Sequence, residues 1–423
     1  MTRILVFSTL YPNAAQPNHG VFVENRLRHT LALGGLDAAV LAPVPYFPFS
    51  HSVFGRYAAF AAVPKRETRH GLEIRHPRYA IVPRIDGGLT PWLLYRAALP
   101  IARRMQAEGR RFDVIDAHYF YPDGVAAAAL GRALDIPVVI TGRGTDLTLI
   151  PQSAGPRARI LGAANEASAM VTVCEDLMHR LTALGADPNR TLVLRNGVDL
   201  ELFSPGDRNA ARSALGLTHF TLLSVGALIP RKGHDLIIRA LAACPDCHLL
   251  IAGSGPLRAE LERLAASQGV VERVRFLGDV PHKRLPEFYR AADVMVLASS
   301  REGWANVLLE AMACGTPVVA TDVNGTAEAL RSDVAGRLMP QRTSESLVET
   351  LNLLRRNMPR REDTRRYAEQ FGWQIIARAN KALLVAVAEA GRAGRESAAP
   401  VETARAVLAA DLPGQAGVER DDH

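Results

Sequence analysis

The sequence predicts an α/β protein with two doubly wound parallel sheets. Short apolar segments alternate with helix-length segments along most of its 423 residues, which is typical of parallel sheets. The apolar segments are nearly continuous, which indicates strands covered on both faces. A polar, turn-rich stretch at Phe203–Asn209 interrupts the alternation near the middle and indicates a linker.

The first half of the chain contains six short apolar segments that we interpret as strands. Helix-length stretches lie between most of them, so a parallel sheet follows. The predicted strands are Ile4–Thr9, Ala38–Pro43, Phe112–Ala117, Pro137–Thr141, Met170–Cys174 and Thr191–Arg195, and the predicted helices are Val21–Leu33, Pro91–Glu108 and Val125–Leu134.

The second half repeats this alternation with five predicted strands. They are Thr221–Val225, His248–Ala252, Val274–Leu277, Val294–Ala298 and Val318–Thr321, with helices at His234–Ala243, Leu257–Ala266 and Asn306–Cys314. We therefore expect two Rossmann-like domains, over residues 1–200 and 201–372, that face each other across a cleft.

The end of the chain has a different composition. We expect a helix over residues 373–390 that returns to the first domain. From residue 391 to 423 the chain is Ala, Gly, Pro and charge without a sustained period, so we expect disorder, although Val401–Leu412 could form a helix.

Composition narrows the class of protein. With 48% hydrophobic and 22% charged residues, the chain suits a soluble globular protein with an ample core. Its net charge of +7 favours anionic partners but does not choose among nucleotides, phosphates, nucleic acid and anionic lipid. Because no segment resembles a signal peptide or a membrane-spanning helix, we expect a cytoplasmic protein.

The four cysteines do not form a disulfide framework in a chain of this length. Cys244-Pro-Asp-Cys247 has the spacing of a redox pair. No second cysteine pair or histidine cluster accompanies it, so we interpret it as an ordinary loop between a helix and a strand.

Residues 44–84 depart from the α/β alternation. The segment is aromatic and Pro-rich at first, and then carries six cations against two glutamates. Aromatic residues beside cations suit an anionic membrane surface or a lipid-phosphate acceptor, which would attach the protein peripherally to the inner face of the cell membrane. The alternative, which we favour slightly, is an ordinary crossover with a solvated basic face.

Two glutamates, Glu302 and Glu310, are the strongest functional signal. Glu302 precedes a predicted helix and Glu310 lies inside it, in a run from Ser300 to Thr321 that reads strand, turn, helix, strand. This places both carboxylates at the carboxyl end of a parallel sheet, where open α/β sheets bind ligands. Solvated salt bridges are the simpler reading, but Gly303 and the aromatic Trp304 beside them disfavour it.

Two glycine loops point to a phosphorylated ligand. The first follows a strand at Gly226 and carries Arg231 and Lys232 just before a helix, so its backbone N–H groups and cations make an anion site. The second, Gly253-Ser-Gly255-Pro, follows the next strand but lacks the third glycine of a dinucleotide fingerprint.

These motifs resemble retaining glycosyltransferase family 4, of the two-domain GT-B fold, in the group 1 found in polysaccharide and exopolysaccharide synthesis. Glu302 to Glu310 is similar to the E-x7-E motif of that family, and the string Glu310–Thr321 is among its most specific. Lys232-Gly233 matches its phosphate-binding lysine. Asn196-Gly-Val-Asp199 matches its usual junction between domains. The resemblance covers about residues 1–390.

The resemblance implies transfer of a hexosyl unit from a nucleoside diphosphate sugar to a glycan or lipid-linked acceptor, with retention and without a metal or other cofactor. Glu310 would accept hydrogen bonds from the ribose, and Glu302 would hold sugar hydroxyls. Lys232 and Arg231 would stabilise charge on the leaving phosphate. The implied donor-binding residues are Gly20, Arg143, Gly226, Gly253, Gly255, Gly303, Asn306, Val307, Leu308 and Glu310.

The chain departs from the family pattern at two positions. Ala227 stands where the family usually has an arginine, and Arg231 is the expected substitute. Arg143 stands where many members have a histidine, and an arginine cannot act as a base. His118 is then the nearby candidate for acceptor-side proton transfer, and a structural role for it is equally open.

Three other functions would fit part of this set of residues. A glycosidase would also use paired carboxylates, but it leaves the phosphate loop unexplained. A nucleotide-sugar epimerase on the same fold would need a base at the donor sugar, and a non-catalytic nucleotide-binding module would not need Lys232, Glu302 and Glu310 together. We expect a nucleotide sugar and a saccharide acceptor as partners, with an anionic membrane surface as a further hypothesis, and no nucleic acid.

Overall fold

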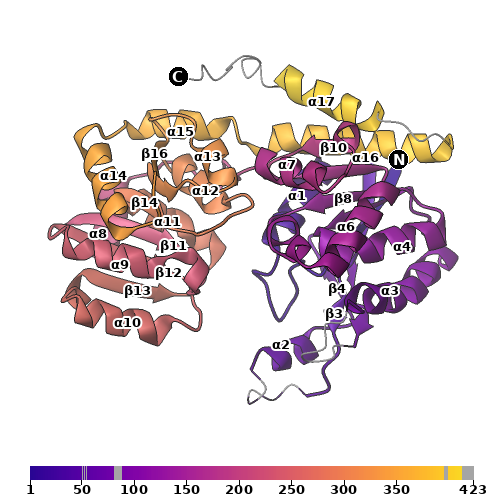
Figure 1. The fold of residues 1–423 in the computed structure, drawn as a ribbon, viewed down its shortest axis with the longest axis horizontal. Helices are drawn as coiled ribbons and strands as arrows, with labels where there is room; N and C mark the ends of the chain where they lie inside the picture. Colours follow the sequence, from indigo (N-terminus) through magenta and orange to yellow (C-terminus); the bar gives the residue numbers. More distant parts are fainter. Residues whose placement is uncertain (50, 52, 54, 81–87, 395–398, 412–423) are drawn as a thin grey trace. The chain divides into compact units, whose positions relative to one another are not determined.

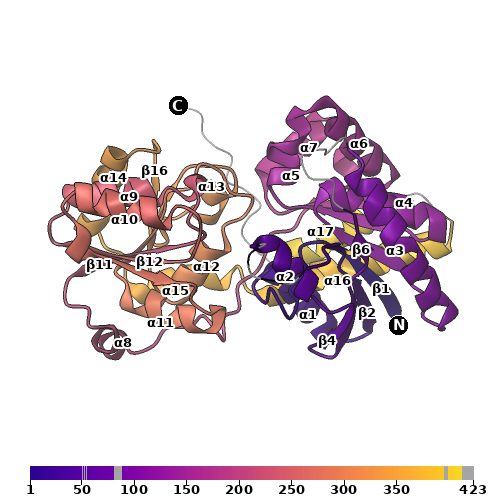
Figure 2. The same cartoon turned by 90° about the horizontal axis from the view of Figure 1, so that it is seen from below.

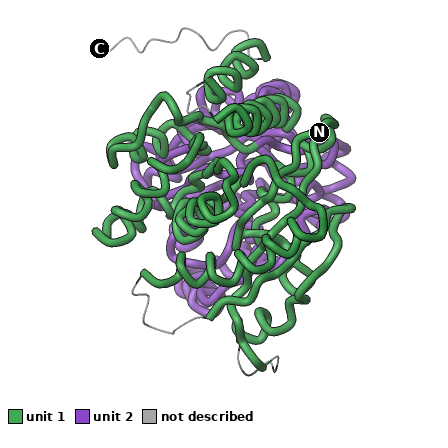
Figure 3. Tube along the Cα trace, turned by 90° about the vertical axis from the view of Figure 1, so that its right-hand side faces the viewer, with its two compact units in different colours: residues 1–196, 373–423 green, residues 197–372 purple. Residues whose placement is uncertain are grey.

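The computed structural model describes residues 1–49, 51, 53, 55–80, 88–394 and 399–411 (Figure 1). The chain forms two compact units (Figure 3). Unit 1 combines Met1–Asn196 with Trp373–His423, and unit 2 is Gly197–Gly372. The chain therefore leaves unit 1 slightly before residue 200 and returns to it at the start of the last long helix.

Unit 1 is built on an eight-stranded sheet in the order β10-β9-β8-β7-β1-β2-β5-β4. All neighbours pair in parallel except the hairpin of β4 and β5 at one edge. A separate parallel pair joins β3 to β6. The strands are β1 Thr2–Phe7, β2 Leu36–Leu41, β3 Val44–Pro45, β4 Arg66–Arg69, β5 Leu72–Arg75, β6 Arg78–Tyr79, β7 Val114–His118, β8 Val138–Gly142, β9 Ala169–Thr172 and β10 Thr191–Val193.

Two helical layers accompany this sheet (Figure 2). Helices α1 and α16 pack together in one layer, and α3, α4 and α6 pack together in the other. The α-helices of the first part of unit 1 are α1 Val21–Ala32, α2 Arg56–Ala62, α3 Thr90–Ala107, α4 Val125–Leu134, α5 Thr145–Thr148, α6 Ala154–Glu166 and α7 Glu175–Ala183.

The helix expected over 373–390 is α16, Trp373–Arg392, and it belongs to unit 1. Its buried face, which includes Leu383, Leu384 and Val387, joins the same apolar core as Ile4 and Val6 of β1. A ring contact with His29 of α1 (centroids 5.3 Å apart) places Trp373 at the start of this packing. Burial of this apolar face accounts for the return of the chain to unit 1.

The expectation of disorder after residue 390 is wrong for Ala399–Asp411, which form helix α17. Val401 and Ala404 are fully buried against the core of unit 1. Arg405 adds hydrogen bonds to the backbone oxygens of Pro188 (3.0 Å) and Thr191 (2.8 Å). The alternative of a helix over Val401–Leu412 is close to the helix that the structure shows. The rest of the predicted tail beyond residue 411 lies outside the described residues.

The described residues of the segment 44–84 include the hairpin of β4 and β5, which lies at the edge of the unit 1 sheet. Several of its cations are already paired: Arg69 with Glu24 (2.9 Å), and Arg75 with Glu73 (2.8 Å) and Glu108 (2.7 Å). These pairings support the ordinary crossover, because a paired arginine has less charge to offer a membrane. Tyr46 and Phe49 remain exposed, and Arg84 lies outside the described residues. Within the described part of the chain, no helix is both long and apolar enough to cross a bilayer.

Unit 2 is built on a six-stranded parallel sheet in the order β13-β12-β11-β14-β15-β16. The strands β14 and β15 are buried along their whole length and are apolar except for Thr321, as expected for a sheet covered on both faces. The strands are β11 Phe220–Val225, β12 Cys247–Ala252, β13 Val274–Gly278, β14 Val294–Leu297, β15 Val318–Thr321 and β16 Gly336–Met339.

Helices lie on both faces of this second sheet (Figure 2). Helices α9, α10 and α14 form one layer, and α8, α11, α12 and α15 form the other. The α-helices are α8 Arg208–Leu215, α9 His234–Ala242, α10 Arg258–Ser267, α11 Leu285–Ala291, α12 Asn306–Ala313, α13 Gly325–Ala329, α14 Ser344–Arg356 and α15 Arg361–Glu369.

The stretch that we interpreted as a linker lies inside unit 2. Phe203 is buried, and Arg208 begins α8 with the side chain of Asp207 accepting a cap hydrogen bond from the backbone N–H of Ala210 (2.9 Å). The turn-rich composition thus reflects a helix cap and not a domain boundary. Cys244, in the loop before β12, and Cys247, the first residue of β12, are both buried in the core of unit 2.

Candidate functional site

The predicted residues of the second half gather at the carboxyl edge of the unit 2 sheet. Gly226 follows β11, Gly253 follows β12, and Glu302 lies a few residues after β14. The strands β12, β11 and β14 are neighbours and run in parallel, so their carboxyl ends meet at one edge.

Glu302 is held between the two predicted phosphate-binding cations. The Nζ atom of Lys232 lies 2.7 Å from one carboxylate oxygen, and a guanidinium nitrogen of Arg231 lies 3.2 Å from the other. Burial raises the pKa of Glu302, but the charges of Lys232 and Arg231 outweigh burial and leave the pKa below its usual value. Glu302 is therefore ionised at neutral pH and is an acceptor only.

Gly226 and Gly233, on either side of the loop that carries Lys232, allow the lysine to reach Glu302. Residues Pro230–Lys232 form a single 3-10 turn, and Gly233 takes a positive φ of 67° before α9. A Cβ at Gly233 would lie 2.1 Å from the backbone oxygen of Ala298, and one at Gly226 would lie 3.2 Å from the Lys232 side chain. Only glycine fits at 233, and glycine at 226 leaves the lysine chain free to reach Glu302.

Gly253 and Gly255 let two loops of unit 2 approach each other. A Cβ at Gly253 would lie 2.0 Å from the backbone oxygen of Gly226, and a Cβ at Gly255 would lie 2.5 Å from that of Leu228. The backbone of Leu228 donates to the oxygen of Ser254 (2.8 Å) across the same gap. Packing thus explains both glycines, and their contact with a donor stays a prediction.

Sequence reasoning missed the residues that brace this loop. Arg342 donates to the backbone oxygens of Ala298 (2.9 Å) and Pro230 (3.3 Å), and so joins the loop before Lys232 to the end of β14. The Asn324 side chain accepts from the backbone N–H of Glu302 (3.3 Å). No motif indicated these residues, since bonds to backbone atoms leave no pattern in the sequence.

The second glutamate, Glu310, lies on α12, whose first three residues are the predicted Asn306, Val307 and Leu308. The Tyr289 hydroxyl donates to one oxygen of Glu310 (2.9 Å), and His282 Nε2 lies 3.0 Å from the other. Glu310 is 8% exposed, so its carboxylate is held almost entirely by protein groups. Gly303 lies between Glu302 and α12.

In unit 1, Gly20 lies at the start of α1 with a φ of 73°. A Cβ there would lie 2.3 Å from the backbone carbonyl of Leu10, which follows β1. The structure therefore explains this glycine by a close approach within unit 1. Its predicted contact with the diphosphate remains untested.

His118 and Arg143 belong to a buried polar network at the end of β7 and β8. Arg143 donates to His118 Nδ1 (2.7 Å) and to the Asn196 side chain (2.8 Å), while His118 Nε2 lies 3.4 Å from Asp116. Burial and the charge of Arg143 lower the pKa of His118 against the opposing effect of Asp116, so the ring is neutral. Both ring nitrogens are engaged, which weighs against the predicted proton-transfer role of His118 and favours a structural one.

Asp123 is another buried acid of unit 1, and no motif in the sequence indicated it. It is fully buried and accepts hydrogen bonds from the backbone N–H (3.2 Å) and the hydroxyl (2.9 Å) of Thr9, which follows β1. Burial raises the pKa of Asp123 to about 8, against the opposing effect of these hydrogen bonds. This carboxyl is therefore largely protonated at neutral pH.

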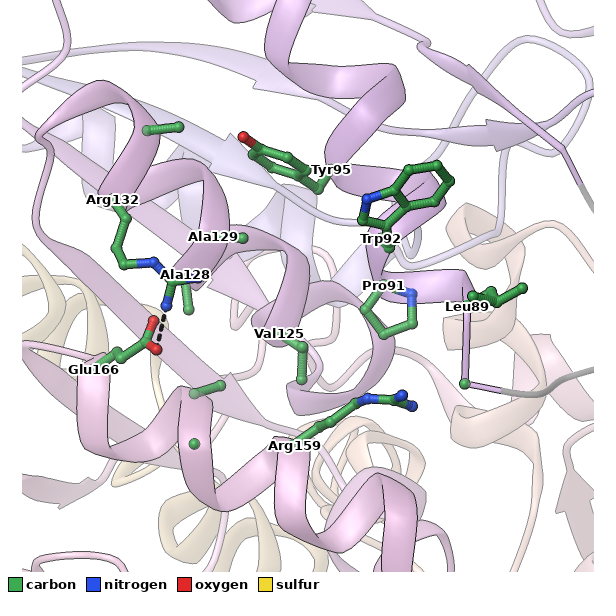
Figure 4. Close-up of a pocket in the computed structure, with 14 residues that line it drawn as sticks. Leu89, Pro91, Trp92, Tyr95, Val125, Ala128, Ala129, Arg132, Arg159 and Glu166 are labelled. Carbon is green, nitrogen blue, oxygen red and sulfur yellow. Dashed lines mark ion pairs between the residues drawn. The ribbon is translucent and has the colours of Figure 1, made fainter.

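Unit 1 also contains a cavity of about 880 Å³ between α3, α4 and α6 (Figure 4). Trp92 and Tyr95 line it from α3, small residues such as Ala128 line it from α4, and Arg132 and Glu166 form an ion pair at its edge. None of the predicted site residues lines this cavity. The described residues show nothing that covers it, so we assign it no role.

Comparison with known proteins places this architecture in a family. Residues 29–202 match the family described as Glycosyltransferase Family 4, and residues 207–371 match the one described as Glycosyl transferases group 1. Proteins named D-inositol 3-phosphate glycosyltransferase are similar: that of Geodermatophilus obscurus is 35% identical (82% of this chain, 83% of that protein). One from Catenulispora acidiphila is 32% identical (92% and 97%).

Solved structures share the fold. Sucrose-phosphate synthase from Thermosynechococcus elongatus superimposes with a TM-score of 0.77 at 22% identity, over 92% of this chain and 100% of that one. Anabaena HepE in complex with UDP superimposes with a TM-score of 0.69 at 21% identity, over 91% and 100%. The two-unit α/β architecture and the family matches agree, and the chain belongs to glycosyltransferase family 4, with the GT-B fold.

Proposed function

We propose that this protein transfers a hexosyl unit from a nucleoside diphosphate sugar to a hydroxyl group of its acceptor, with retention of configuration. The observation that carries this proposal is the placement of Glu302 between Lys232 and Arg231 at the carboxyl edge of the unit 2 sheet. A charged acceptor beside two cations suits a donor that presents both sugar hydroxyls and a diphosphate.

Each group in this cluster has a role that follows from its charge. Glu302, as a carboxylate, accepts hydrogen bonds from hydroxyls of the donor sugar. Lys232 and Arg231 shift part of their interaction from Glu302 to the diphosphate, whose negative charge grows as it leaves. The helix start at Asn306 adds backbone N–H groups that favour an anion.

The proposed step balances without a protein nucleophile. The acceptor oxygen bonds to the anomeric carbon on the face from which the diphosphate oxygen departs. The bond between that carbon and the diphosphate oxygen breaks, and the acceptor proton passes to the leaving phosphate. Configuration is thereby retained, and the cations of unit 2 stabilise the charge of the leaving group.

The ligands bound in structures of the same fold support a nucleotide sugar as the donor. Anabaena HepE is described in complex with UDP and, in another structure, with UDP-glucose. At about one-fifth identity these complexes indicate a donor class and leave the base and the sugar of this chain open.

Two acceptor classes remain in competition. A glycan or lipid-linked saccharide, as in cell-surface or exopolysaccharide synthesis, follows from the family resemblance and from the aromatic, basic segment 44–84. A small phosphorylated polyol is favoured by the names of the relatives, which are D-inositol 3-phosphate glycosyltransferases. The internal pairing of Arg69 and Arg75 weakens the argument for a lipid surface and makes the polyol the first acceptor to test.

A donor screen tests the first half of the proposal. A thermal-shift series with UDP, ADP and GDP should raise the melting temperature with at least one of them, because a ligand that binds the folded state stabilises it by mass action. The sugar nucleotides of that base are then incubated with inositol phosphate, with lipid-linked saccharides and without acceptor. No stabilisation by any nucleotide would contradict the proposed donor.

The reaction type is tested by the product. Retention predicts that the new glycosidic bond has the anomeric configuration of the donor, which proton NMR reads from the anomeric coupling. Inversion would refute the proposed step. If the donor sugar changes configuration at another carbon without any acceptor, the protein is an epimerase and not a transferase.

A further inference from the structure

Glu310 is held by two protein groups from two different elements. The hydroxyl of Tyr289, on α11, donates to Oε2 (2.9 Å), and His282, in the 3-10 turn before α11, lies 3.0 Å from Oε1 through Nε2. Burial and the charge of Glu310 raise the pKa of Tyr289 well above its ordinary value, so it remains a donor. Glu310 therefore has one neutral donor and one titratable donor.

Asp199 of the junction motif, and Phe203 shortly after it, lie around His282. The ring of Phe203 packs edge-on against His282 (centroids 5.1 Å apart) and against Tyr289 (6.0 Å). Asp199 accepts hydrogen bonds from the backbone of Glu201 (3.1 Å) and Leu202 (3.0 Å) and adds its charge near His282. These groups pack around the His282 ring, which lies next to Glu310.

The charged groups around His282 favour its protonated form. Burial lowers its pKa, but the hydrogen bond and charge of Glu310 and the charge of Asp199 outweigh burial and raise the pKa above its ordinary value. Lys283 and Arg284 follow in the same turn; Arg284 is paired with Glu287 (3.0 Å), and both side chains are exposed. The effect of Glu310 and Asp199 on the pKa of His282 is therefore larger than that of the neighbouring cations.

The carboxylate of Glu310 can accept hydrogen bonds from the two ribose hydroxyls in addition to those from His282 and Tyr289. A carboxylate offers about four lone-pair sites, so two remain when His282 and Tyr289 each occupy one. A nucleotide diphosphate is itself an anion, and an uncompensated Glu310 would repel it. An imidazolium on Oε1 offsets that charge while it orients the carboxylate.

We propose that His282 is a positioning residue for the nucleotide donor, which acts as an imidazolium that orients and neutralises Glu310 for the ribose hydroxyls. This assignment rests on the proposed function. It predicts that nucleotide affinity falls as the pH rises and His282 loses its proton, because the neutral ring no longer offsets the charge of Glu310.

The test is the affinity of UDP, or of ADP or GDP if the thermal-shift screen selects it, measured by calorimetry between about pH 6 and pH 8.5. In the wild type, Kd should rise about three- to tenfold across this range beyond the change caused by the nucleotide's own ionisation. In His282→Gln, Kd should be weakened at low pH and should show only the change that the nucleotide itself causes. Parallel pH profiles for the two proteins would overturn the assignment.

Two further variants separate positioning from general damage. His219→Gln removes an exposed histidine of the same unit and should keep the wild-type profile. Tyr289→Phe removes the other donor to Glu310 and should weaken binding by a similar factor at every pH. Loss of the pH dependence in His219→Gln would also contradict the proposal.

A second measurement does not depend on a folded variant. By linkage, a nucleotide that prefers protonated His282 must raise the pKa of that histidine when it binds. NMR titration of the His282 ring in the wild type, with and without the nucleotide, measures this directly. An unchanged pKa would overturn the assignment, whereas failure of all three nucleotides to bind would instead refute the proposed donor and, with it, this role.

Discussion

Asp123 in unit 1 and Glu302 in unit 2 both lie near the carboxyl edge of their sheet with little exposure, but Asp123 is neutral and Glu302 is charged. Asp123 in unit 1 has the hydroxyl and backbone N–H of Thr9 as donors, and its pKa is raised to about 8. Glu302 in unit 2 has two cations, and its pKa is lowered. Burial alone makes an acid neutral, and only neighbouring cations keep it charged. Lys232 and Arg231 therefore maintain a negative charge on Glu302 at the carboxyl edge of the unit 2 sheet.

The largest effect should come from removal of one cation of the charged cluster. In Lys232→Ala, turnover should fall about 100- to 1,000-fold, as when one electrostatic stabiliser of a transition state is lost. Initial rates with the donor found in the screen measure this, and circular dichroism checks that the variant is folded. Lys283→Ala, an exposed lysine of the same unit, is the matched control and should retain full turnover. If the turnover of Lys232→Ala stayed within threefold of the wild type, the charged cluster around Glu302 would have no role in the reaction.

The opposite shifts of the two carboxyl groups predict different responses to pH. The folded pKa of Asp123 exceeds its ordinary value of 3.8, so its contribution to stability is complete below that value and is lost as the pH rises through about 8. Relative to Asp123→Asn, the wild type should lose up to about 1.4 kcal/mol per pH unit between pH 5 and pH 7. Urea denaturation at several pH values measures this difference.

Glu302 supplies the control for that experiment. Its folded pKa lies below its ordinary value of 4.5, so its contribution is present above that value and is lost only as the pH falls further. The stability difference between the wild type and Glu302→Gln should therefore be constant between pH 5 and pH 7. A matching slope in both variants would show that the two carboxyl groups do not differ as described.

A smaller effect is expected from the brace of the unit 2 loop. Arg342→Ala removes the hydrogen bonds to Ala298 and Pro230, so Lys232 should be held less well, and turnover should fall about tenfold, which corresponds to about 1.4 kcal/mol. Steady-state kinetics should show this loss mainly in kcat. Arg337→Ala, which removes only an exposed pair with Asp333, should have no effect. Equal turnover in the wild type, Arg342→Ala and Arg337→Ala would show that Arg342 does not contribute to the reaction.

The sheets could be predicted because their strands are buried on both faces and therefore read as short apolar runs. The strand β15, for example, has the predicted bounds Val318–Thr321, and α4 has the predicted bounds Val125–Leu134. Glu302 and Lys232 could be placed on one site because each follows a strand of the same parallel sheet. Their direct contact at 2.7 Å was not predicted, since it depends on the turn at Gly233.

Other parts of the site could not be predicted, for physical reasons. His282 and Tyr289 reach Glu310 from 28 and 21 residues away, and neither lies in a glycine loop or a charged motif. Arg342 acts on backbone oxygens, which every residue possesses. The burial of His118 depends on how β7 and β8 pack, so the sequence left its structural and functional roles equally open.

The discontinuous path of unit 1 has a consequence for how the protein is made. Unit 2 is a single continuous stretch, so all of its residues are synthesised before helices α16 and α17. The core of unit 1 needs Leu383, Leu384 and Val387 of α16, which are translated after the whole of unit 2. We therefore expect unit 1 to complete its fold only after unit 2 has been synthesised. A purified chain truncated after residue 372 should contain a protease-resistant unit 2 and a protease-sensitive unit 1.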